Sequence, residues 1–457
     1  MAVSKKLHFW GIAGHTMRGL ALAARELGYE VTGTDPGGKP PGSDWLDEHQ
    51  IMWWKKSDPR HVQGVDILVV SGGIPLEDPE LKAAEAAGIP VVSYAQFVGD
   101  LAKDKRRLVV AGTHGKTTTA SLLTWLLESA GKQPDYLIGI QPRNFDTSVR
   151  LSDSPVVVLE GDEYMAAPID KRSKFAYYKP DVLITTSLEM DHPDLFPDIQ
   201  AIIERFHELV TNMAQGGHFL YWSGSPHLAE LAAQAPCKHE SYGEHGDWHA
   251  DHVSYAPEGL SFDLYEKSTH KGHYQIGLYG RHNVDNATAA IAAALGEGLS
   301  PEAIQAGCQQ FAGAARRFQI VSRPGAAITV VDDYAHHPTE IAATIEAAKA
   351  HFGGRVIAVV RPHTYSRTKE LLEEYRQAVR LADAAVVADI EGAREAHLEA
   401  TVSGEDIARD NGSVRYEADR DDLIKAVEAA AQPGDIVLSM TVSGYNDLAE
   451  ELAATLN

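Results

Sequence analysis

Hydrophobic and polar positions follow one repeated pattern along almost the whole chain, a short apolar run and then a longer stretch with helical spacing. Short apolar runs are typical of strands buried on both faces, and the stretches between them are typical of amphipathic helices. We expect strands at residues 7–11, 30–33, 66–70, 90–92, 108–110, 155–159, 181–185, 328–331, 355–360, 384–388 and 435–439. We expect helices at residues 17–27, 120–130, 287–295 and 339–351. This alternation predicts an α/β protein built on parallel sheets.

The expected elements group into blocks that predict three domains, at residues 1–104, 105–322 and 323–457. The first and third blocks are typical of Rossmann-like, doubly wound domains, and the central block of a domain with a mainly parallel sheet. The basic segment at residues 103–107 is typical of a linker. Residues 215–280 are richer in Gly and His, which favours an antiparallel or irregular extension.

Composition narrows the class of protein. The chain has 457 residues, too many for one core, and its formal net charge of -23 argues against nucleic acid or an anionic membrane as a general partner. Cys237 and Cys308 lie in no metal-ligand or redox spacing, and no apolar run is long enough to span a bilayer. The first residues lack a signal-peptide core. We therefore expect a cytoplasmic enzyme that acts on small molecules, as a monomer or a weak dimer.

The segment Val109–Thr119 combines an apolar run, a tight Gly-containing loop and the start of a helix-forming run. This order is the context of a phosphate-binding loop, in which backbone N–H groups and a helix N-terminus hold an anion. Lys116 adds a positive charge for the β- and γ-phosphates of ATP, and Thr117 offers Mg2+ a hydroxyl. Val110 stands where the common loop has its first Gly, which predicts a shortened variant. The alternative is a simple Gly turn before a helix.

The turn after the first apolar run, Gly11–Gly19, is similar to a dinucleotide-binding turn but departs from it. Ala13 and Thr16 stand where that motif has its second and third glycines, which let the backbone approach a pyrophosphate. Asp35, at the end of the next expected strand, suits a ribose hydroxyl. The turn fits a nucleotide site and a purely structural turn equally well.

Carboxylates follow two expected strands of the central block, at residues 160–163 (Glu-Gly-Asp-Glu) and 189–193 (Glu-Met-Asp-His-Pro). The carboxyl ends of parallel strands share one edge of a sheet, and oxygen ligands suit Mg2+. We expect the two groups to end neighbouring strands and to share a metal. The alternatives are a solvated acidic loop and a structural Asp-His pair.

Polar clusters also lie near the second domain boundary and in the third block. Asn286 can read an adenine edge or cap the helix expected at residues 287–295. The arginines at residues 316–317 can reach a γ-phosphate when domains close, or belong to a solvated linker. Residues 332–339 and 361–368 follow two expected strands, where open sheets bind ligands, and buried ion pairs are the alternative.

Together these motifs resemble the Mur ligase family over nearly the whole chain. The matching stretches are residues 111–119, 160–163, 191–192, 280–286 and 332–340, in family order. The resemblance implies a first domain that binds a UDP-sugar, a central P-loop ATPase domain, and a third domain that binds an amino acid or peptide. It also implies ATP-dependent amide formation on UDP-N-acetylmuramate through an acyl phosphate, with ATP and Mg2+ as cofactors.

The resemblance assigns roles residue by residue. The catalytic residues it implies are Lys116, Glu160, His192, Arg317 and His336. The Mg2+ ligands it implies are Thr117, Glu160 and His192. The ATP-binding residues it implies are Gly112, Thr113, His114, Gly115, Lys116, Thr117, Thr118, His282, Asn283, Asn286, Arg317 and Asp332. The substrate-binding residues it implies are Gly11, Gly14, His15, Thr16, Met17, Asp35, Ser71, His336 and Arg367.

Two branches of the family act on UDP-N-acetylmuramate, and the chain resembles both. Residues 170–175 (Asp-Lys-Arg-Ser-Lys-Phe), 11–17 and 188–196 resemble the branch that attaches recycled L-alanyl-γ-D-glutamyl-meso-diaminopimelate in peptidoglycan recycling. Residues 362–368 and 389–395 resemble the branch that adds L-alanine in peptidoglycan synthesis. We favour the peptide acceptor. An exposed charged turn is the other interpretation of residues 170–175.

The remaining expectations concern a carbamylated lysine and two alternative functional classes. His207 stands where several Mur ligases have a carbamylated lysine, so no carbamate is expected. A dinucleotide-dependent oxidoreductase would leave the Gly-Lys-Thr loop unused. A nucleotide-gated binding protein would keep ATP and the loop without ligase chemistry.

Overall fold

The computed structural model of the chain describes residues 4–193, 195–398, 400–410, 412–442 and 444–457. Residue 194, within the stretch 188–196 that resembles the recycling branch, lies outside these described residues. The chain divides into two units. The first contains Met1–Leu188, Gln200–Trp248 and Ala289–Gly307, and the second contains Glu189–Ile199, His249–Thr288 and Cys308–Asn457.

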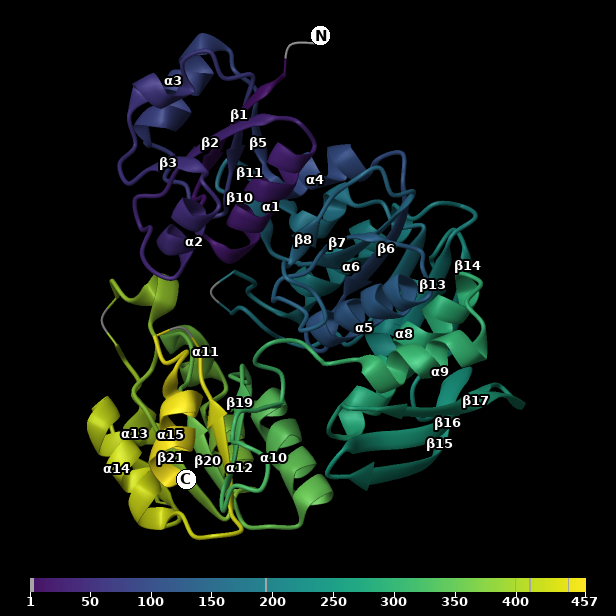
Figure 1. Ribbon diagram of the computed structural model, residues 1–457, viewed down its shortest axis with the longest axis vertical. Helices are drawn as coiled ribbons and strands as arrows, with labels where there is room; N and C mark the ends of the chain where they lie inside the picture. The colour runs from purple at the N-terminus through teal and green to yellow at the C-terminus, as the bar shows by residue number, and fades with distance from the viewer. Residues whose placement is uncertain (1–3, 194, 399, 411, 443) are drawn as a thin grey trace. The chain divides into compact units, whose positions relative to one another are not determined.

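The first domain is built on a parallel sheet in the order β3-β2-β1-β4-β5. Strands β1, β2, β3 and β5 of this sheet are labelled in Figure 1. Its strands are β1 (Lys6–Trp10), β2 (Glu30–Thr34), β3 (Met52–Trp54), β4 (Ile67–Val70) and β5 (Val91–Ser93). Its helices are α1 (His15–Glu26), α2 (Gly42–Glu48), η1 (Pro59–Val62), α3 (Pro79–Ala87) and α4 (Tyr94–Ala102). The strand order reverses beside β1, so the loops after β1 and β4 lie together where doubly wound sheets bind ligands.

The central domain continues the first unit with a sheet in the order β14-β13-β12-β6-β9-β7-β8. Its strands are β6 (Arg106–Ala111), β7 (Asp135–Leu137), β8 (Val149–Arg150), β9 (Val156–Gly161), β12 (Val182–Thr185), β13 (His218–Trp222) and β14 (Lys238–Tyr242). A hairpin of β10 (Met165–Ala167) and β11 (Asp170–Ser173) and the short helix η2 (Lys174–Tyr177) lie between β9 and β12 in sequence. The strands of the sheet pair in parallel, except β7 with β8.

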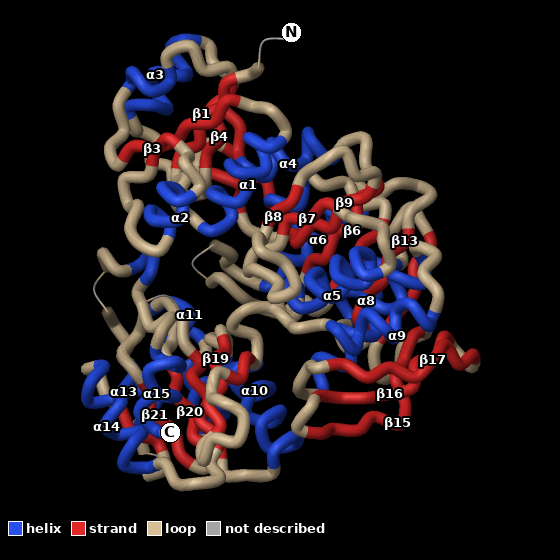
Figure 2. Tube along the Cα trace, in the orientation of Figure 1, coloured by secondary structure: helices blue, strands red, loops and turns tan. Residues whose placement is uncertain are grey.

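Helices and a strand extension complete the middle of the chain. The helices are α5 (Lys116–Ser129), α6 (Ile199–Thr211), α7 (Pro226–Ala232), α8 (Arg281–Gly296) and α9 (Pro301–Gln310). The extension consists of β15 (Trp248–Ala256), β16 (Gly259–Glu266) and β17 (Thr269–Ile276), which lie side by side in Figure 2. β16 and β17 form an antiparallel pair, as expected for part of residues 215–280. β13 and β14, in the same stretch, instead pair in parallel within the central sheet.

The C-terminal domain, in the second unit, has a sheet in the order β18-β19-β23-β20-β21-β22. Its strands are β18 (Gln319–Ile320), β19 (Thr329–Asp333), β20 (Val356–Val360), β21 (Ala384–Val387), β22 (Val414–Tyr416) and β23 (Ile436–Met440). Its helices are α10 (Pro338–Phe352), α11 (Tyr365–Glu370), α12 (Leu372–Val379), η3 (Ala393–Glu395), α13 (Gly404–Ala408), α14 (Arg420–Ala430) and α15 (Leu448–Leu456). The strands pair in parallel, except β18 with β19.

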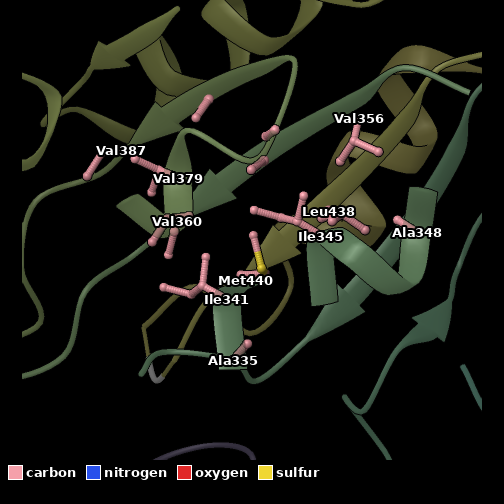
Figure 3. Close-up of a cluster of buried hydrophobic side chains, with 14 of the residues drawn as sticks. Ala335, Ile341, Ile345, Ala348, Val356, Val360, Val379, Val387, Leu438 and Met440 are labelled. Carbon is pink, nitrogen blue, oxygen red and sulfur yellow. The ribbon is translucent and has the colours of Figure 1, made fainter. Parts of the chain in front are cut away.

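Both faces of this C-terminal sheet are buried, which explains why β20 is apolar at every position. Val356 and Val360 face a core formed with α10 and α12, shown in Figure 3. Ile357 and Val359 face a second core formed with α14 and α15. Side chains of a strand alternate between faces, so a strand covered on both sides needs apolar residues throughout.

The α/β class with Rossmann-like outer domains and a P-loop central domain is confirmed, while two local expectations are wrong. The basic segment 103–107 is not only a linker, because β6 begins at Arg106 and the ammonium of Lys105 is held 2.6 Å from Asp135 Oδ2. The helix expected from residue 287 begins earlier, at Arg281. Within the residues that the structure describes, no helix has both the length and the apolar character needed to cross a bilayer.

Candidate active site

The phosphate loop connects β6 to α5 as the sequence predicts. β6 ends at Ala111 and α5 begins at Lys116, so four loop residues lead directly into the helix N-terminus. Gly112 has a φ of 138°, and a Cβ atom there would lie 2.2 Å from Thr186 Oγ1. The loop therefore requires glycine at this position, where it passes close to the segment that follows β12.

Ser187, just after β12, holds two backbone N–H groups of this loop. Thr113 N donates to the Ser187 carbonyl at 3.1 Å, and His114 N donates to Ser187 Oγ at 2.8 Å. Strand β12 pairs with β6, which brings the two segments together. The loop is thus shaped by its neighbour as well as by its own glycines, and the sequence did not identify Ser187 as part of it.

Thr117 and Glu160 meet where β9 ends beside α5. Thr117 Oγ1 donates to Glu160 Oε1 at 2.8 Å, and Gly139 N donates to Glu160 Oε2 at 2.7 Å. Both side chains are buried. Burial and then the charge of Asp162 raise the pKa of Glu160 above its ordinary value. A hydroxyl and a carboxylate in contact at a phosphate loop form an oxygen donor pair that fits Mg2+.

Two lysines hold the other carboxylates of the acidic segment, residues 160–163. Lys116 Nζ lies 3.4 Å from Glu163 Oε2 and also donates to the Gly112 carbonyl. Lys174 Nζ donates to Asp162 Oδ2 at 3.0 Å. Burial opposes the charge of Asp162, but Lys174 and Lys116 lower its pKa below the ordinary value.

The first domain brings its turn residues together at the reversal in strand order. Gly11 has a φ of 79°, and a Cβ atom there would lie 2.4 Å from Ser71 Oγ, which follows β4. Gly14, His15 and Thr16 form the entry to α1, and Gly14 and His15 are exposed. These residues are placed where a doubly wound sheet binds a ligand.

Met17 and Asp35, both expected to bind substrate, also have structural roles. The Met17 side chain is 4% exposed and packs on the buried face of α1, and its role in substrate binding stays a prediction. Asp35 Oδ2 accepts from Ala13 N at 2.9 Å, and Oδ1 accepts from Gly37 N at 3.0 Å. Asp35 therefore stabilises the turn, because its carboxylate is engaged by backbone N–H groups.

In the second unit, Arg367 of α11 is bound by the segment that follows β12. Arg367 is 1% exposed, and its Nε and Nη2 donate to Asp191 Oδ1 at 2.9 and 2.7 Å. Nη1 donates to the His363 carbonyl at 3.3 Å, and Nη2 lies 3.5 Å from His192 Nδ1. These contacts engage the guanidinium in an internal ion pair, and the expected role of Arg367 in binding an acceptor carboxylate stays a prediction.

The metal expected to be shared between the two acidic groups needs a correction. The central sheet has the order β12-β6-β9, so the strands before Glu160 and Asp191 are separated by β6 and are not neighbours. Asp191 is paired with Arg367, as a structural Asp would be. His192 has a φ of 54° and follows this anchored residue. Its role as a metal ligand stays a prediction.

His336 follows β19 and is held as a neutral imidazole. Its Nδ1 lies 2.9 Å from the Tyr334 carbonyl, which can only accept, so Nδ1 carries the proton in that contact. Burial lowers the pKa of His336, although Glu340 opposes this shift. Nε2 of this tautomer is then a proton acceptor, as the expected role requires.

The two arginines before β18 are in different surroundings. Arg316 Nε donates to Asp332 Oδ2 at 3.0 Å, and Arg316 Nη2 donates to the Thr441 carbonyl at 2.6 Å, so this residue joins strand ends. Arg317 Nη1 lies 3.7 Å from Glu340 Oε1, and its Nε is buried with no hydrogen-bond partner among the residues that the structure describes. Arg317 is therefore the better placed of the two to bind an anion. Asp332, expected to contact ATP, is bound by Arg316.

The residues expected at the adenine lie on the first turns of α8. Asn283 Nδ2 donates to the Tyr279 carbonyl and Asn286 Nδ2 donates to Asn283 Oδ1, each at 2.8 Å. Both amides are buried, whereas His282 is exposed. Asn286 lies inside the helix, so the alternative of an N-cap at this residue is wrong.

Comparison with known proteins identifies the family of the chain. Residues 6–106 match the family described as "Mur ligase family, catalytic domain", residues 110–294 match "Mur ligase middle domain", and residues 316–441 match "Mur ligase, glutamate ligase domain". A UDP-N-acetylmuramate–L-alanyl-γ-D-glutamyl-meso-2,6-diaminoheptandioate ligase of Escherichia coli is 34% identical over 453 residues, 98% of this chain and 97% of the relative. The chain belongs to the Mur ligase family. Mur ligases are ATP-dependent ligases that form amide bonds, and this chain is such an enzyme.

Other Mur ligases are about as similar. A UDP-N-acetylmuramate–L-alanine ligase of Rubrobacter xylanophilus is 33% identical over 460 residues, 99% of this chain and all of the relative. The solved murein peptide ligase of Psychrobacter arcticus is 29% identical, with a TM-score of 0.74 and 99% of both chains covered. The solved UDP-N-acetylmuramate:L-alanyl-γ-D-glutamyl-meso-diaminopimelate ligase of Neisseria meningitides is 35% identical, with a TM-score of 0.64, and covers 69% of this chain and all of its own.

The Mur ligase family fixes the class of the enzyme, and the individual site residues stay predictions. The structure brings together Gly112, Thr117 and Glu160 in the first unit, as expected for a Mur ligase phosphate site. It also adds residues that the sequence did not assign, foremost Ser187 and Lys174. The domain boundaries at residues 104 and 322 likewise stay predictions.

Proposed function

We propose that this Mur ligase joins UDP-N-acetylmuramate to L-alanyl-γ-D-glutamyl-meso-diaminopimelate, as a murein peptide ligase in peptidoglycan recycling. The Escherichia coli relative with that printed activity matches 98% of this chain, and the 35% identical solved ligase, which covers 69% of this chain, has it as well. Residues 170–175, which resemble the recycling branch, are only partly exposed, since Ser173, Lys174 and Phe175 are buried while Lys171 and Arg172 are exposed. The nucleotide substrates also fit the expected cytoplasmic location.

The contact of Thr117 with Glu160 beside the phosphate loop is the observation that best supports ATP-dependent chemistry at this site. Thr117 and Glu160 would hold Mg2+, which when bound neutralises charge on the transferred phosphoryl group. Lys116, on the same loop, would bind the phosphates and stabilise negative charge as the lactoyl carboxylate attacks the γ-phosphate. The product is an acyl phosphate, whose phosphate is a good leaving group.

The second step needs a neutral amine and a place for its proton. In the second unit, His336 is a neutral imidazole whose Nδ1 is fixed by the Tyr334 carbonyl. Its Nε2 would take the proton released as the L-alanyl amine attacks the acyl phosphate. Arg317, whose buried Nε has no hydrogen-bond partner in the described part of the chain, would hold the phosphoryl oxygens. Amide, ADP and phosphate are the products.

Trapping the acyl phosphate tests this function. With ATP, Mg2+ and UDP-N-acetylmuramate but no acceptor, hydroxylamine should give the lactoyl hydroxamate with one ADP formed for each hydroxamate. Glu160→Gln should abolish the trapped product while Lys171→Met, on an exposed residue of the β10–β11 hairpin, should leave it unchanged. ADP release without hydroxamate would contradict the proposal.

The L-alanine ligases are the second candidate, because residues 362–368 resemble that branch. His363 Nδ1, in this stretch, lies 3.1 Å from Arg367 Nη1. This is a contact within the protein, so it gives no direct evidence that L-alanine is the acceptor. The acceptor is therefore decided by turnover with each amine.

A further inference from the structure

Residues 164–177 join the first domain to the acidic segment at residues 160–163. Ala167, in β10, packs into the hydrophobic cluster beneath β4 of the first domain. The backbone of Tyr177 passes so close to α4 that a Cβ atom on Gly99 would lie 2.7 Å from its carbonyl oxygen. This segment is thus a fixed part of the boundary between the first and central domains.

Lys174 lies at the centre of this boundary, with its side chain 10% exposed. Its Nζ donates to Asp162 Oδ2 at 3.0 Å and lies 3.9 Å from the centre of the Tyr164 ring. The ring of Tyr94, the first residue of α4 in the first domain, is 5.1 Å away. An ammonium held by one carboxylate and two aromatic faces is strongly fixed.

The backbone around Lys174 fixes the acidic segment as well. Ser173 Oγ donates to the Glu163 carbonyl at 2.6 Å. Lys174 N donates to the Tyr164 carbonyl at 3.1 Å, and Phe175 N donates to the Asp162 carbonyl at 3.3 Å. Residues 173–175 therefore set the position of the acidic segment, and not only its charge.

Each carboxylate of the acidic segment contacts a different group. Asp162 has the ammonium of Lys174, and Glu163 has that of Lys116. Glu160 instead accepts hydrogen bonds from Thr117 and Gly139. Two negative charges are thus matched by lysines, and the third faces the hydroxyl at the phosphate loop.

We propose that Lys174 is a positioning residue that ties Asp162 to the first-domain boundary, so that Glu160 alone presents a carboxylate to Mg2+ beside Thr117. This inference rests on the proposed function only as far as the ATP and Mg2+ site, and not on the identity of the acceptor. It gives Lys174, within residues 170–175, a role: its ammonium balances the charge of Asp162 near the phosphate site.

Removing the Lys174 ammonium changes metal and nucleotide binding in opposite directions. In Lys174→Met the Asp162 carboxylate loses the Lys174 ammonium and keeps the hydrogen bond from Tyr164, so the net charge near Glu160 becomes more negative by one. Added negative charge attracts a free divalent cation and repels the phosphates of ATP. If the substitution only disturbed packing, it would instead weaken the binding of both the metal and the nucleotide.

Two binding measurements without acceptor test this inference. Mn2+ binding is followed by electron paramagnetic resonance without nucleotide, and a fluorescent ATP analogue is titrated with Mg2+ present. We expect Lys174→Met to bind Mn2+ about 3-fold more tightly and the nucleotide about 10-fold more weakly, as for one uncompensated buried charge. Asp162→Asn combined with Lys174→Met should return both affinities to within about 3-fold of the wild type, since the net charge is restored.

Lys171→Met is the matched control, because it makes the same change three residues earlier, at an exposed residue of β11, and both affinities should stay at the wild-type values. Weaker binding of both ligands by Lys174→Met, with no recovery in the double variant, would overturn the inference. If Lys174→Met does not fold, Asp162→Asn decides the question: weaker Mn2+ binding with undiminished nucleotide binding supports it, and no change in either opposes it. Wild-type protein that binds no nucleotide would instead overturn the proposed function.

Discussion

Replacing Arg367 by Met tests whether this residue is an internal anchor or an acceptor clamp. Arg367 is 1% exposed and makes two hydrogen bonds to Asp191 Oδ1, at 2.9 and 2.7 Å. Breaking a buried ion pair by removing one partner costs about 3–5 kcal/mol, because the other charge stays buried without its counter-charge. Asp191 keeps the hydrogen bond from His192 N at 2.7 Å, so we expect the lower end, about 3 kcal/mol.

The assay is urea unfolding of the wild type, Arg367→Met, Asp191→Asn and the double variant. The double variant should recover most of the lost free energy of unfolding, because neither charge is left alone. Lys369→Met, at an exposed position of the same helix, should change this free energy by less than about 0.5 kcal/mol. Unchanged stability in Arg367→Met, together with a raised KM for the acceptor alone, would refute the reasoning and restore Arg367 as an acceptor ligand.

Three further predictions concern Gly112 and Glu160 at the ATP site and the proton acceptor His336. Gly112→Ala should weaken ATP binding by about 100-fold in calorimetry, because the new Cβ would lie 2.2 Å from Thr186 Oγ1; an affinity within 3-fold of the wild type would contradict this. Glu160→Gln should lower kcat by roughly 100-fold or more with the protein still folded, measured as phosphate release, and a near-normal kcat would remove it from the metal site. Burial lowers the pKa of His336, so the acidic limb of kcat should have its midpoint below pH 6.5 and vanish in His336→Asn; a midpoint above 6.5 would oppose its role as proton acceptor.

The phosphate site was predictable because its residues are adjacent in sequence or follow strands directly. Lys116 and Thr117 begin the helix after the loop, and Glu160 lies near the end of β9, which pairs with the strand before that loop. A strand, a loop and a helix in this order leave little freedom in where the side chains lie. The fold class followed from the same alternation of apolar runs and helical stretches.

The sequence is least informative where a side chain finds its partner in another part of the chain. Arg367 is paired with Asp191, and only the folded second unit brings the two together. Lys174 stands in a charged run that is typical of an exposed turn, yet the rings of Tyr94 and Tyr164 enclose its ammonium. Asp35 binds the turn beside it, which a pattern cannot distinguish from binding a ribose. The sequence shows which residues carry charge, but not which of them form ion pairs or hydrogen bonds within the protein.

Phosphate release with ATP, Mg2+ and UDP-N-acetylmuramate, compared between L-alanine and L-alanyl-γ-D-glutamyl-meso-diaminopimelate, tests the central claim most directly. We expect turnover with the tripeptide and none above background with L-alanine. Mass spectrometry should confirm that the amide forms. Turnover with L-alanine and none with the tripeptide would contradict it and assign the enzyme to peptidoglycan synthesis.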